Sequence, residues 1–536
     1  LRDDYEKLLR AVDFYDYLEI QPVDSYYHLF DTGDDAYDEA CIKDAIKKII
    51  KAGKARGKII VATGDVHIIN KEDTRLREIF INTPMVGGGL HPLYNARRLP
   101  SQHFRLTEEM LEEFAFLGKD QAEEIVIVNT NLIADMIERF PLFPDKLFAP
   151  SDDSLKNRGV PSMKQAVIDL TYERARNLYG KDLPPFIGDR VKKELDSIIN
   201  NNFASIYYIS HLLVKHSRDA GYIVGSRGSV GSSLVAFFMG ITEVNALPPH
   251  YYCPKCNFLA IKLNNEEKKK YAPFVKAELF EETLQAAGTG YDLPAAECPL
   301  CGHDLGRDGV DIPFETFLGI KGDKVPDIDL NFSGEYQSRA HDFLRELFGE
   351  DHTFRAGTIS TIADRMAWGF VKGFLERRGI QARRCEIVRL ADKITGVKRS
   401  TGQHPGGIVI IPKEIDHNEI IPVQYPADDL SSPWRTTHYD YHKFEDNLLK
   451  MDILGHDDPT MIRHLMDYVE KEPEKFPFAA AEEIPLADEK VLALFSGLSS
   501  LGVDATDVRE VVGTTGLPEF GTPLAKEMLR EIRPKS

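Results

Sequence analysis

The sequence of 536 residues has no apolar run as long as a membrane span, and its first residues, Leu-Arg-Asp-Asp-Tyr, do not resemble a signal peptide. Its six cysteines are too few for a disulfide framework in a chain of this length. An excess of basic charge is absent too, because the formal net charge is −19. We therefore predict a cytoplasmic protein without a membrane partner. An initial methionine is also missing, which predicts a fragment.

The acidic balance is only a weak argument against nucleic-acid binding, because surface charge acts locally, over about 8 Å at physiological salt. Residues 355–399 carry eleven Lys and Arg side chains against four acidic ones. Apolar residues recur at helical spacing from Ile359 to Phe374, which predicts a helix with one docked face and one cationic face. This segment is either a solvated helical face or a surface that binds nucleic-acid phosphates.

The length predicts about three domains. In the first section, to about residue 150, helical and strand patterns alternate. A buried strand over 58–63 precedes Asp65 and His67, which we expect on one face of an extended segment. The rims of α/β barrels carry polar groups in this way, and both residue types bind metals, as does Glu19 in another strand-like run. A structural role for the pair is the alternative, because no His-x-His cluster precedes it.

A Gly/Ser-rich turn follows two predicted helices, over 162–179 and 189–220, and a predicted strand over 222–224. A cation, a flexible backbone and a hydroxyl come together in Arg227, Gly228 and Ser229. A further helix begins directly after the turn, and its N-terminal amides would favour an anion. The turn has neither Walker A nor G-x-G-x-x-G spacing, so a phosphate cradle and a plain turn are both open.

Four of the cysteines form two C-x-x-C pairs, Cys253 with Cys256 and Cys298 with Cys301. Two such pairs are typical of a structural zinc site with four thiolate ligands. A closed site of this kind has no open coordination position, so we do not expect it to be catalytic. The 41 intervening residues are rich in Lys and Glu, as an exposed insertion would be.

Three aspartates lie in strand-like apolar runs. Asp327 and Asp329 alternate with apolar residues, so an extended strand would place both carboxylates on one face. Such like charges repel unless a cation lies between them, although a solvated strand edge is the alternative for this pair alone. Asp452 lies in a second apolar run with Lys450 on the same face, and a shared cation would supply the partner that a buried carboxylate needs. Between the two runs, residues 402–407 predict a tight turn.

These parts together favour nucleotidyl transfer. Three carboxylates can hold two Mg²⁺ ions about 3.5–4 Å apart, one activating an attacking hydroxyl and one neutralising the leaving pyrophosphate. The Gly/Ser-rich turn would hold the nucleotide, and the basic segment would bind the nucleic acid by its phosphates.

Four motifs resemble the palm motifs of C-family bacterial replicative DNA polymerases: Gly225-Ser-Arg-Gly-Ser-Val-Gly-Ser-Ser, Pro326-Asp-Ile-Asp-Leu-Asn-Phe, Thr401-Gly-Gln-His-Pro-Gly-Gly and Leu449-Lys-Met-Asp-Ile-Leu-Gly. The two cysteine pairs and the run from Gly322 to Gln337 resemble the PolC branch, the polymerase III alpha subunit of low-GC Gram-positive bacteria. The resemblance extends over nearly the whole chain.

The resemblance implies an α/β multidomain protein. Its expected parts are the C-terminal part of a PHP (β/α)-barrel domain (1–150), the first part of a polymerase-beta-like nucleotidyltransferase palm (151–357) with a zinc-binding insertion at about 250–305, a helical thumb (358–397), the second part of the palm (398–456) and the beginning of α-helical fingers (457–536).

The resemblance also implies roles for individual residues. The catalytic ligands of two Mg²⁺ ions would be Asp327, Asp329 and Asp452; the nucleotide contacts would be Arg227, Gly228, Ser229 and Lys450; a PHP metal site would include Asp65, His67 and Glu19; and the DNA contacts would be Arg365, Lys372, Arg377, Arg378, Lys398 and Arg399. The expected partners are primer–template DNA, dNTPs and, through regions beyond this sequence, a sliding clamp and other replisome proteins.

Two other functions compete with DNA-templated DNA synthesis in bacterial chromosome replication. The first is a PHP-type metal-dependent phosphoesterase that uses Asp65 and His67, and it predicts phosphate release that survives Asp327→Asn. The second is a zinc-stabilised nucleic-acid-binding protein, and it predicts binding without metal-dependent chemistry.

Overall fold

The structure is a computed structural model that describes residues 5–85, 89–142, 146–319, 324–426, 429–486 and 488–534. Gly322, at the start of the PolC-like run, and Ser536 lie outside the described residues. The chain divides into two compact units, one formed by Leu1–Leu142 with Ile359–Ser400 and the other by Phe143–Thr358 with Thr401–Ser536.

The first unit contains a small parallel sheet packed against helices. Strand β1 (Tyr17–Ile20) pairs with β2 (Ile59–Ala62), which confirms the strand predicted over 58–63. The helices of its N-terminal part are α1 (Tyr5–Phe14), α2 (Asp35–Ala55), α3 (Thr74–Ile81), α4 (Thr107–Glu113), α5 (Lys119–Glu123) and α6 (Asn129–Asp135). Ile20, Ile60 and Phe114 are buried in their shared core. The described residues form an α/β section with two strands here, so the complete PHP barrel stays a prediction.

A pair of helices completes the first unit. Helices α15 (Asp364–Arg377) and α16 (Arg384–Ile394) pack together and against α3, with Ile79 of α3 and Phe374 buried between them. The predicted helical spacing from Ile359 is wrong for its first turn, because residues up to Thr361 belong to strand β8 (Thr353–Thr361). Ile359 is exposed in that strand, and the helix begins only at Asp364.

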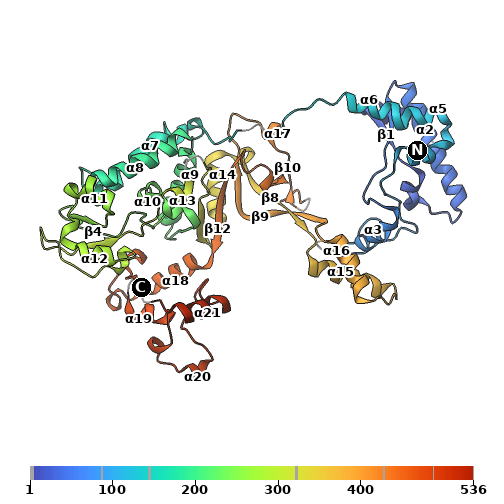
Figure 1. Cartoon of the computed structure of the whole chain (residues 1–536). Helices are drawn as coiled ribbons and strands as arrows, with labels where there is room; N and C mark the ends of the chain where they lie inside the picture. The colour runs from blue at the N-terminus through green and yellow to red at the C-terminus, as the bar shows by residue number, and fades with distance from the viewer. Residues whose placement is uncertain are drawn as a thin grey trace. The chain divides into compact units, whose positions relative to one another are not determined.

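The second unit is built around a mixed sheet of seven described strands, in the order β10-β11-β8-β9-β12-β7-β3 (Figure 1). Their bounds are β3 (Gly225–Arg227), β7 (Asp329–Ser333), β8 (Thr353–Thr361), β9 (Lys398–Ile410), β10 (Val423–Gln424), β11 (Thr436–Asp440) and β12 (Leu449–His456). Strand β12 is parallel to β7 and antiparallel to β9, so it lies in the middle of the sheet. Such a strand is buried on both sides, which explains its nearly continuous apolar sequence.

The tight turn predicted at 402–407 is wrong, because strand β9 runs straight through these residues. Gly407 pairs with Asp452 of β12, and a Cβ atom on Gly406 would lie 2.6 Å from the carbonyl oxygen of Ile453. The glycines therefore serve a close approach of two strands rather than a turn.

Helices cover the sheet on the side of the Gly/Ser-rich segment. They are α7 (Met163–Tyr179), α8 (Pro185–Asn200), α9 (Ala204–Asp219), α10 (Leu234–Phe238), α13 (Glu315–Leu318) and α14 (Gln337–Phe348). Helix α17 (His417–Ile420) instead packs through Ile420 against a separate cluster that includes Phe354 and Val409. The single helix predicted over 189–220 is wrong: α8 and α9 are separated at Asn202, which has a φ of +60°. The strand predicted over 222–224 is displaced to Gly225–Arg227, because these residues pair antiparallel with β7.

A small sheet and a C-terminal group of helices complete the second unit. Strands β4 (His250–Tyr252), β5 (Leu259–Ile261) and β6 (Gly306–Asp308) form a sheet in the order β5-β4-β6, accompanied by α11 (Asn265–Tyr271) and α12 (Glu281–Ala286). The C-terminal helices are α18 (Asp457–Lys471), α19 (Glu489–Leu492), α20 (Ala505–Val508) and α21 (Pro523–Ile532). None of the helices in the described part of the chain combines the length and apolar character that a membrane span needs.

Candidate functional site

Adjacent strands bring the three predicted aspartates together. Asp452 on β12 stands directly opposite Asp329, the first residue of β7, in parallel register. Asp327 lies just before β7 rather than in it, so the prediction that both members of the pair lie on one strand is wrong for Asp327. One carboxylate oxygen of each of the three residues nevertheless lies within 4.8 Å of the others. The sheet thus assembles a three-carboxylate cluster from segments more than a hundred residues apart in the sequence.

The two oxygens of Asp452 have different surroundings. Oδ2 lies 2.8 Å from Nζ of Lys450, and both side chains are largely buried. Oδ1 is buried and accepts no hydrogen bond from any described residue. A buried carboxylate oxygen without a partner is costly, and a divalent cation bound by oxygen ligands would remove that cost. The residues present therefore fit a hard divalent metal.

His404 is the nearest other polar group to that oxygen, with Nδ1 3.9 Å from Oδ1 of Asp452. It is not an ion-pair partner, because Nδ1 already accepts the backbone N–H of Gly407 at 2.6 Å. Burial also lowers the pKa of His404, although the charge of Asp452 opposes this effect. The imidazole is thus neutral, with its proton on Nε2. Sequence reasoning did not single out His404 and missed its place beside the cluster.

The carboxyl groups of Asp327 and Asp329 ionise less readily than usual when no cation is bound. Burial raises the pKa of Asp329 to about 6, and the charges of Asp327 and Asp452 add to the rise. Burial also raises the pKa of Asp327, helped by the charge of Asp452. Lys450 and, for Asp329, Arg227 oppose these shifts. The like charges therefore repel one another, as expected for a metal site without its metal.

This repulsion predicts a proton release that depends on pH. At pH 6, Mg²⁺ binding should displace a proton from Asp329, whose pKa is raised to about 6, whereas at pH 8 the carboxyl is already ionised. Titration calorimetry in buffers of different ionisation enthalpy measures the number of protons released. The same raised pKa fixes the sign for stability. In metal-free protein the protonated group stabilises the fold fully below pH 3.8, and this contribution is lost as the pH rises from 3.8 to about 6. Equal proton release at pH 6 and pH 8, or unchanged release by Asp329→Asn, would contradict this prediction.

The Gly/Ser-rich turn lies at the edge of the same sheet. Arg227 is opposite Asp329 in the antiparallel register of β3 with β7. Gly228 has a φ of +72°, and a Cβ atom there would have no neighbour within 4 Å, so the backbone of the turn is open to a ligand. The turn continues as a 3₁₀ segment over Gly228–Ser232.

The expected anion site at the N-terminus of helix α10 is wrong. The backbone N–H of Val235 donates to Oε2 of Glu194, and that of Ala236 donates to Oγ of Ser233. These amides are therefore occupied within the protein. The accessible polar groups of the motif belong to Arg227, Gly228 and Ser229 instead.

Tyr441 is a further neighbour of the cluster that sequence reasoning missed. Nζ of Lys450 lies 4.3 Å from the centroid of its ring. Burial and the charge of Asp452 raise the pKa of Tyr441, which keeps the phenol neutral. Lys450 is thus held between an aromatic face and a carboxylate. No motif marks Tyr441, since its approach depends on the folding of a loop between β11 and β12.

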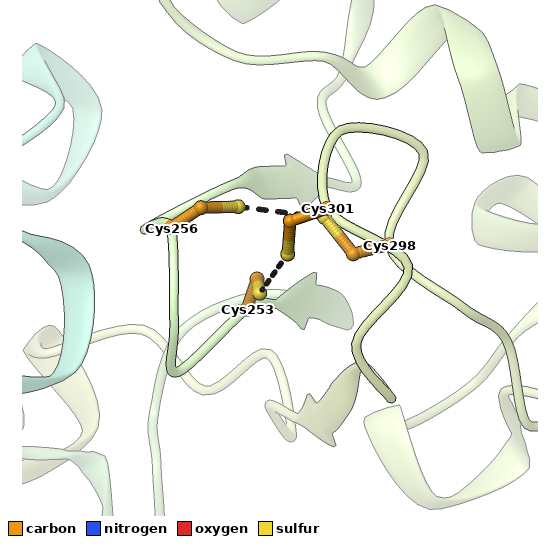
Figure 2. Close-up of side chains that lie close together, drawn as sticks. All are labelled: Cys253, Cys256, Cys298 and Cys301. Atoms are coloured by element: carbon orange, nitrogen blue, oxygen red, sulfur yellow. Dashed lines mark hydrogen bonds between the residues drawn. The ribbon is translucent and has the colours of Figure 1, made fainter.

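The four predicted cysteines form a second cluster, in the small sheet (Figure 2). The Sγ atoms of Cys253 and Cys301 are 3.5 Å apart, as are those of Cys256 and Cys298. Tetrahedral thiolates with Zn–S bonds of about 2.3 Å would be separated by roughly 3.8 Å, close to these distances. Each pair lies on a tight loop, closed by Asn257 N–H to Cys253 O and by Gly302 N–H to Cys298 O. The thiol groups therefore fit a four-coordinate metal.

Backbone amides also favour the thiolate form. Although burial acts in the opposite direction, hydrogen bonds from the N–H groups of Cys256 and Lys255, and from the thiols of Cys256 and Cys301, lower the pKa of Cys253 to about 6. Burial and hydrogen bonds with the other three cysteines raise the pKa of Cys256, so the thiolate is favoured at Cys253 and disfavoured at Cys256. Thiolates are the form that binds zinc.

Both clusters lie in a part of the chain that matches a known protein family. The family model described as "Bacterial DNA polymerase III alpha NTPase domain" matches residues 165–376 and 376–455, which include all three aspartates and all four cysteines. The chain belongs to the bacterial DNA polymerase III alpha family. A second family model, "Bacterial DNA polymerase III alpha subunit finger domain", matches residues 458–536.

Individual relatives of this polymerase III alpha chain are PolC-type DNA polymerases III, which confirms the resemblance seen in the sequence. Identity is 48% over 523 residues with the protein of Halalkalibacterium halodurans, covering 98% of this chain and 34% of the relative. It is 47% over 529 residues with that of Bacillus subtilis, covering 99% and 34%. It is 49% over 521 residues with that of Lacticaseibacillus paracasei, covering 97% and 33%. The chain thus spans about a third of the length of the curated relatives that it matches.

The candidate PHP residues of this polymerase III alpha chain do not form a three-ligand cluster within the described residues. Asp65 has a φ of +44°, so the prediction of an extended Asp-x-His segment is wrong. Its carboxylate lies 3.3 Å from Nε2 of His67 and accepts a hydrogen bond from Gln102, while Glu19 accepts one from Thr63. A metal site at these three residues stays a prediction.

The six basic residues predicted to bind DNA have different surroundings. Arg378 forms an ion pair with Glu78 at 2.6 Å, and Arg377 donates to the carbonyl oxygen of Asn82, so both are engaged with helix α3 and the residue after it. Arg399 contacts Met366 and the ring of Phe370. Arg365, Lys372 and Lys398 are exposed, as are Arg377 and Arg378, and Lys372 lies 3.7 Å from Glu376 of its own helix. DNA binding by this helix pair stays a prediction.

Proposed function

We propose that this chain supplies the catalytic palm of a DNA-templated DNA polymerase that acts in bacterial chromosome replication, and hence in the cytoplasm. The observation that carries the proposal is the three-carboxylate cluster of Asp327, Asp329 and Asp452, in which one buried oxygen has no partner among the described residues. The family relation supports the same function, because the curated relatives are named DNA polymerases III.

The three carboxylates would hold two Mg²⁺ ions. When bound, the ions would activate the primer 3′-hydroxyl and neutralise the leaving pyrophosphate. Asp452 would use its free Oδ1 as the ligand, because its Oδ2 is held by Lys450 at 2.8 Å. Lys450 fixes the orientation of that carboxylate while Asp329 and Asp327 contribute the remaining acidic oxygens.

The Gly/Ser-rich turn would bind the triphosphate of the incoming dNTP. Arg227 supplies a positive charge next to Asp329, and the open backbone at Gly228 with the Ser229 hydroxyl supplies neutral donors. Primer–template DNA would be bound by its phosphates, with the exposed residues Arg365, Lys372, Arg377, Arg378 and Lys398 as candidates. A sliding clamp and other replisome proteins would bind outside this sequence.

The four cysteines would hold one structural Zn²⁺ ion. Four thiolate ligands leave no open position, so this metal would stabilise the fold and take no part in the reaction.

The test is primer extension by the full-length protein with Mg²⁺, a primed template and four dNTPs. We expect products whose sequence follows the template and whose formation requires the divalent ion. Phosphate release from dNTPs or phosphomonoesters without extension would favour the phosphoesterase, and DNA binding without any metal-dependent product would favour the non-catalytic zinc protein. Either result would contradict the proposed function.

A further inference from the structure

A buried acidic side chain lies behind the Gly/Ser-rich turn. Glu194 on helix α8 has no exposed surface. Its Oε1 accepts a hydrogen bond from Nε of Arg190 at 2.6 Å, and its Oε2 accepts from Oγ of Ser233 at 3.0 Å and from the N–H of Val235 at 3.1 Å. Both carboxylate oxygens therefore have partners, and one of them caps helix α10. Burying an ionic pair is expensive, so its retention beside a ligand-binding turn calls for an explanation.

Arg190 connects this carboxylate to the turn itself. Its Nη2 donates to the carbonyl oxygens of Ser232 at 3.0 Å and Ile312 at 3.2 Å. Oγ of Ser232 in turn donates to the carbonyl oxygen of Ser229 at 2.6 Å. A continuous series of hydrogen bonds thus runs from Glu194 through Arg190 and Ser232 to Ser229. It ends at a residue that borders the open face of the turn.

We propose that Glu194 and Arg190 are positioning residues for the triphosphate-binding turn. They hold residues 228–232 in one conformation before the nucleotide arrives, so that binding does not have to order the turn. This inference rests on the proposed function, because it assigns a task to residues that support its nucleotide site. Neither residue touches the nucleotide; each acts through Ser232 and Ser229.

The physical basis is preorganisation. A loop that is ordered on binding reduces the affinity of its ligand, and a small displacement of positioning groups slows the reaction. If the pair served only the core, its substitution would lower thermal stability without a specific effect on any one kinetic parameter. If the pair positions the turn, its substitution would raise the dNTP concentration needed for half-maximal rate and would leave the affinity for primed DNA unchanged.

The decisive variant is Glu194→Gln in the full-length protein. Glutamine has one acceptor oxygen and one NH₂ group, so it cannot accept from Arg190 and from the Val235 N–H at the same time. We expect the half-saturating dNTP concentration in primer extension to rise about tenfold or more, as lost hydrogen bonds to charged groups would cause. Arg190→Lys keeps the charge but loses the planar fork, so we expect a rise in the same direction.

The matched control is Asp196→Asn on the same helix. Asp196 pairs with Lys192 over four residues, as Glu194 pairs with Arg190, but its side chain is 58% exposed. We expect this variant to match the wild type in dNTP dependence and melting temperature. Ser233→Ala, which removes one donor to Glu194, provides a milder variant should Glu194→Gln fail to fold, and we expect a smaller rise with it.

The outcomes separate this inference from the function on which it rests. If the wild type extends the primer and the Asp452→Asn variant does not, the proposed function is supported. If Glu194→Gln, Arg190→Lys and Ser233→Ala then keep the wild-type half-saturating dNTP concentration, even with a lower melting temperature, the pair is purely structural and the inference is overturned. Absence of extension by the wild type overturns the function and the inference together.

Discussion

Asp452→Asn is expected to lower the rate of primer extension by about a thousandfold or more, because it removes a charged metal ligand from a two-metal site. Asparagine keeps the shape of the side chain and offers a single neutral oxygen. The Asp452 carboxylate has two oxygens, Oδ2 paired with Lys450 and Oδ1 without a hydrogen-bond partner among the described residues, and we propose Oδ1 as the metal ligand. Single-turnover primer extension measures the effect. Asp327→Asn and Asp329→Asn should act in the same direction, since their oxygens complete the cluster.

Although Asp329→Asn should lower the rate of primer extension, it should raise the thermal stability of the metal-free protein. Because burial and neighbouring charges raise the pKa of Asp329 to about 6, its ionised form destabilises the metal-free fold at pH 7. The neutral variant should therefore melt at a higher temperature than the wild type in the absence of Mg²⁺. Asp467→Asn on α18, where Asp467 pairs with Arg463 at the surface, is the control and should change neither property. Primer extension that persists at wild-type rates in all three cluster variants would reject the two-metal site.

The sequence allowed the aspartate cluster to be predicted because each carboxylate interrupts an apolar strand pattern. A charge in a buried strand needs a partner, and three such charges in one chain can share a cation. The register that places Asp452 opposite Asp329 could not be predicted, because it depends on pairing between strands more than a hundred residues apart. The neighbouring residues Tyr441 and His404 were missed for the same reason, because tertiary packing alone brings them to the cluster.

Local patterns were misleading where the sheet overrides them. Glycines at 402–407 suggested a turn, yet these residues lie in strand β9. Glycine is needed at 406 because β12 approaches too closely for a side chain there. The amphipathic pattern over 189–220 continues through Asn202, where the backbone turns and separates α8 from α9. Sequence reasoning also missed the role of Glu194 within that pattern. An acidic residue at a core position of an amphipathic helix could have indicated it, since such a residue is rarely buried unless it is paired.

Removal of the zinc site is expected to have the second large effect. Cys298→Ala should abolish the binding of about one zinc ion per chain and lower the free energy of unfolding by roughly 5 kcal/mol or more, because metal binding contributes directly to folding of such sites. The loss should also reach the seven-stranded sheet. Cys253, Cys298 and Tyr251 of the small sheet share one hydrophobic core with Leu330 and Phe332 of β7. A hydrogen bond of 2.9 Å also joins Nε2 of His250 to the hydroxyl group of Tyr179 on α7.

Metal analysis of protein purified in reducing buffer, followed by thermal unfolding, tests this expectation. Cys385→Ala is the control, because Cys385 is an exposed free thiol of helix α16 outside the cluster. It should retain zinc and the wild-type melting temperature. Because the small sheet and the seven-stranded sheet share a core, we expect the zinc-free variant to lose the secondary structure of both in one transition at a lower temperature. A wild-type protein that contains no zinc would contradict the metal assignment. A zinc-free Cys298→Ala variant with unchanged stability would instead contradict the structural role of the metal, since the packing of Cys253 and Cys298 against the core would then suffice without it.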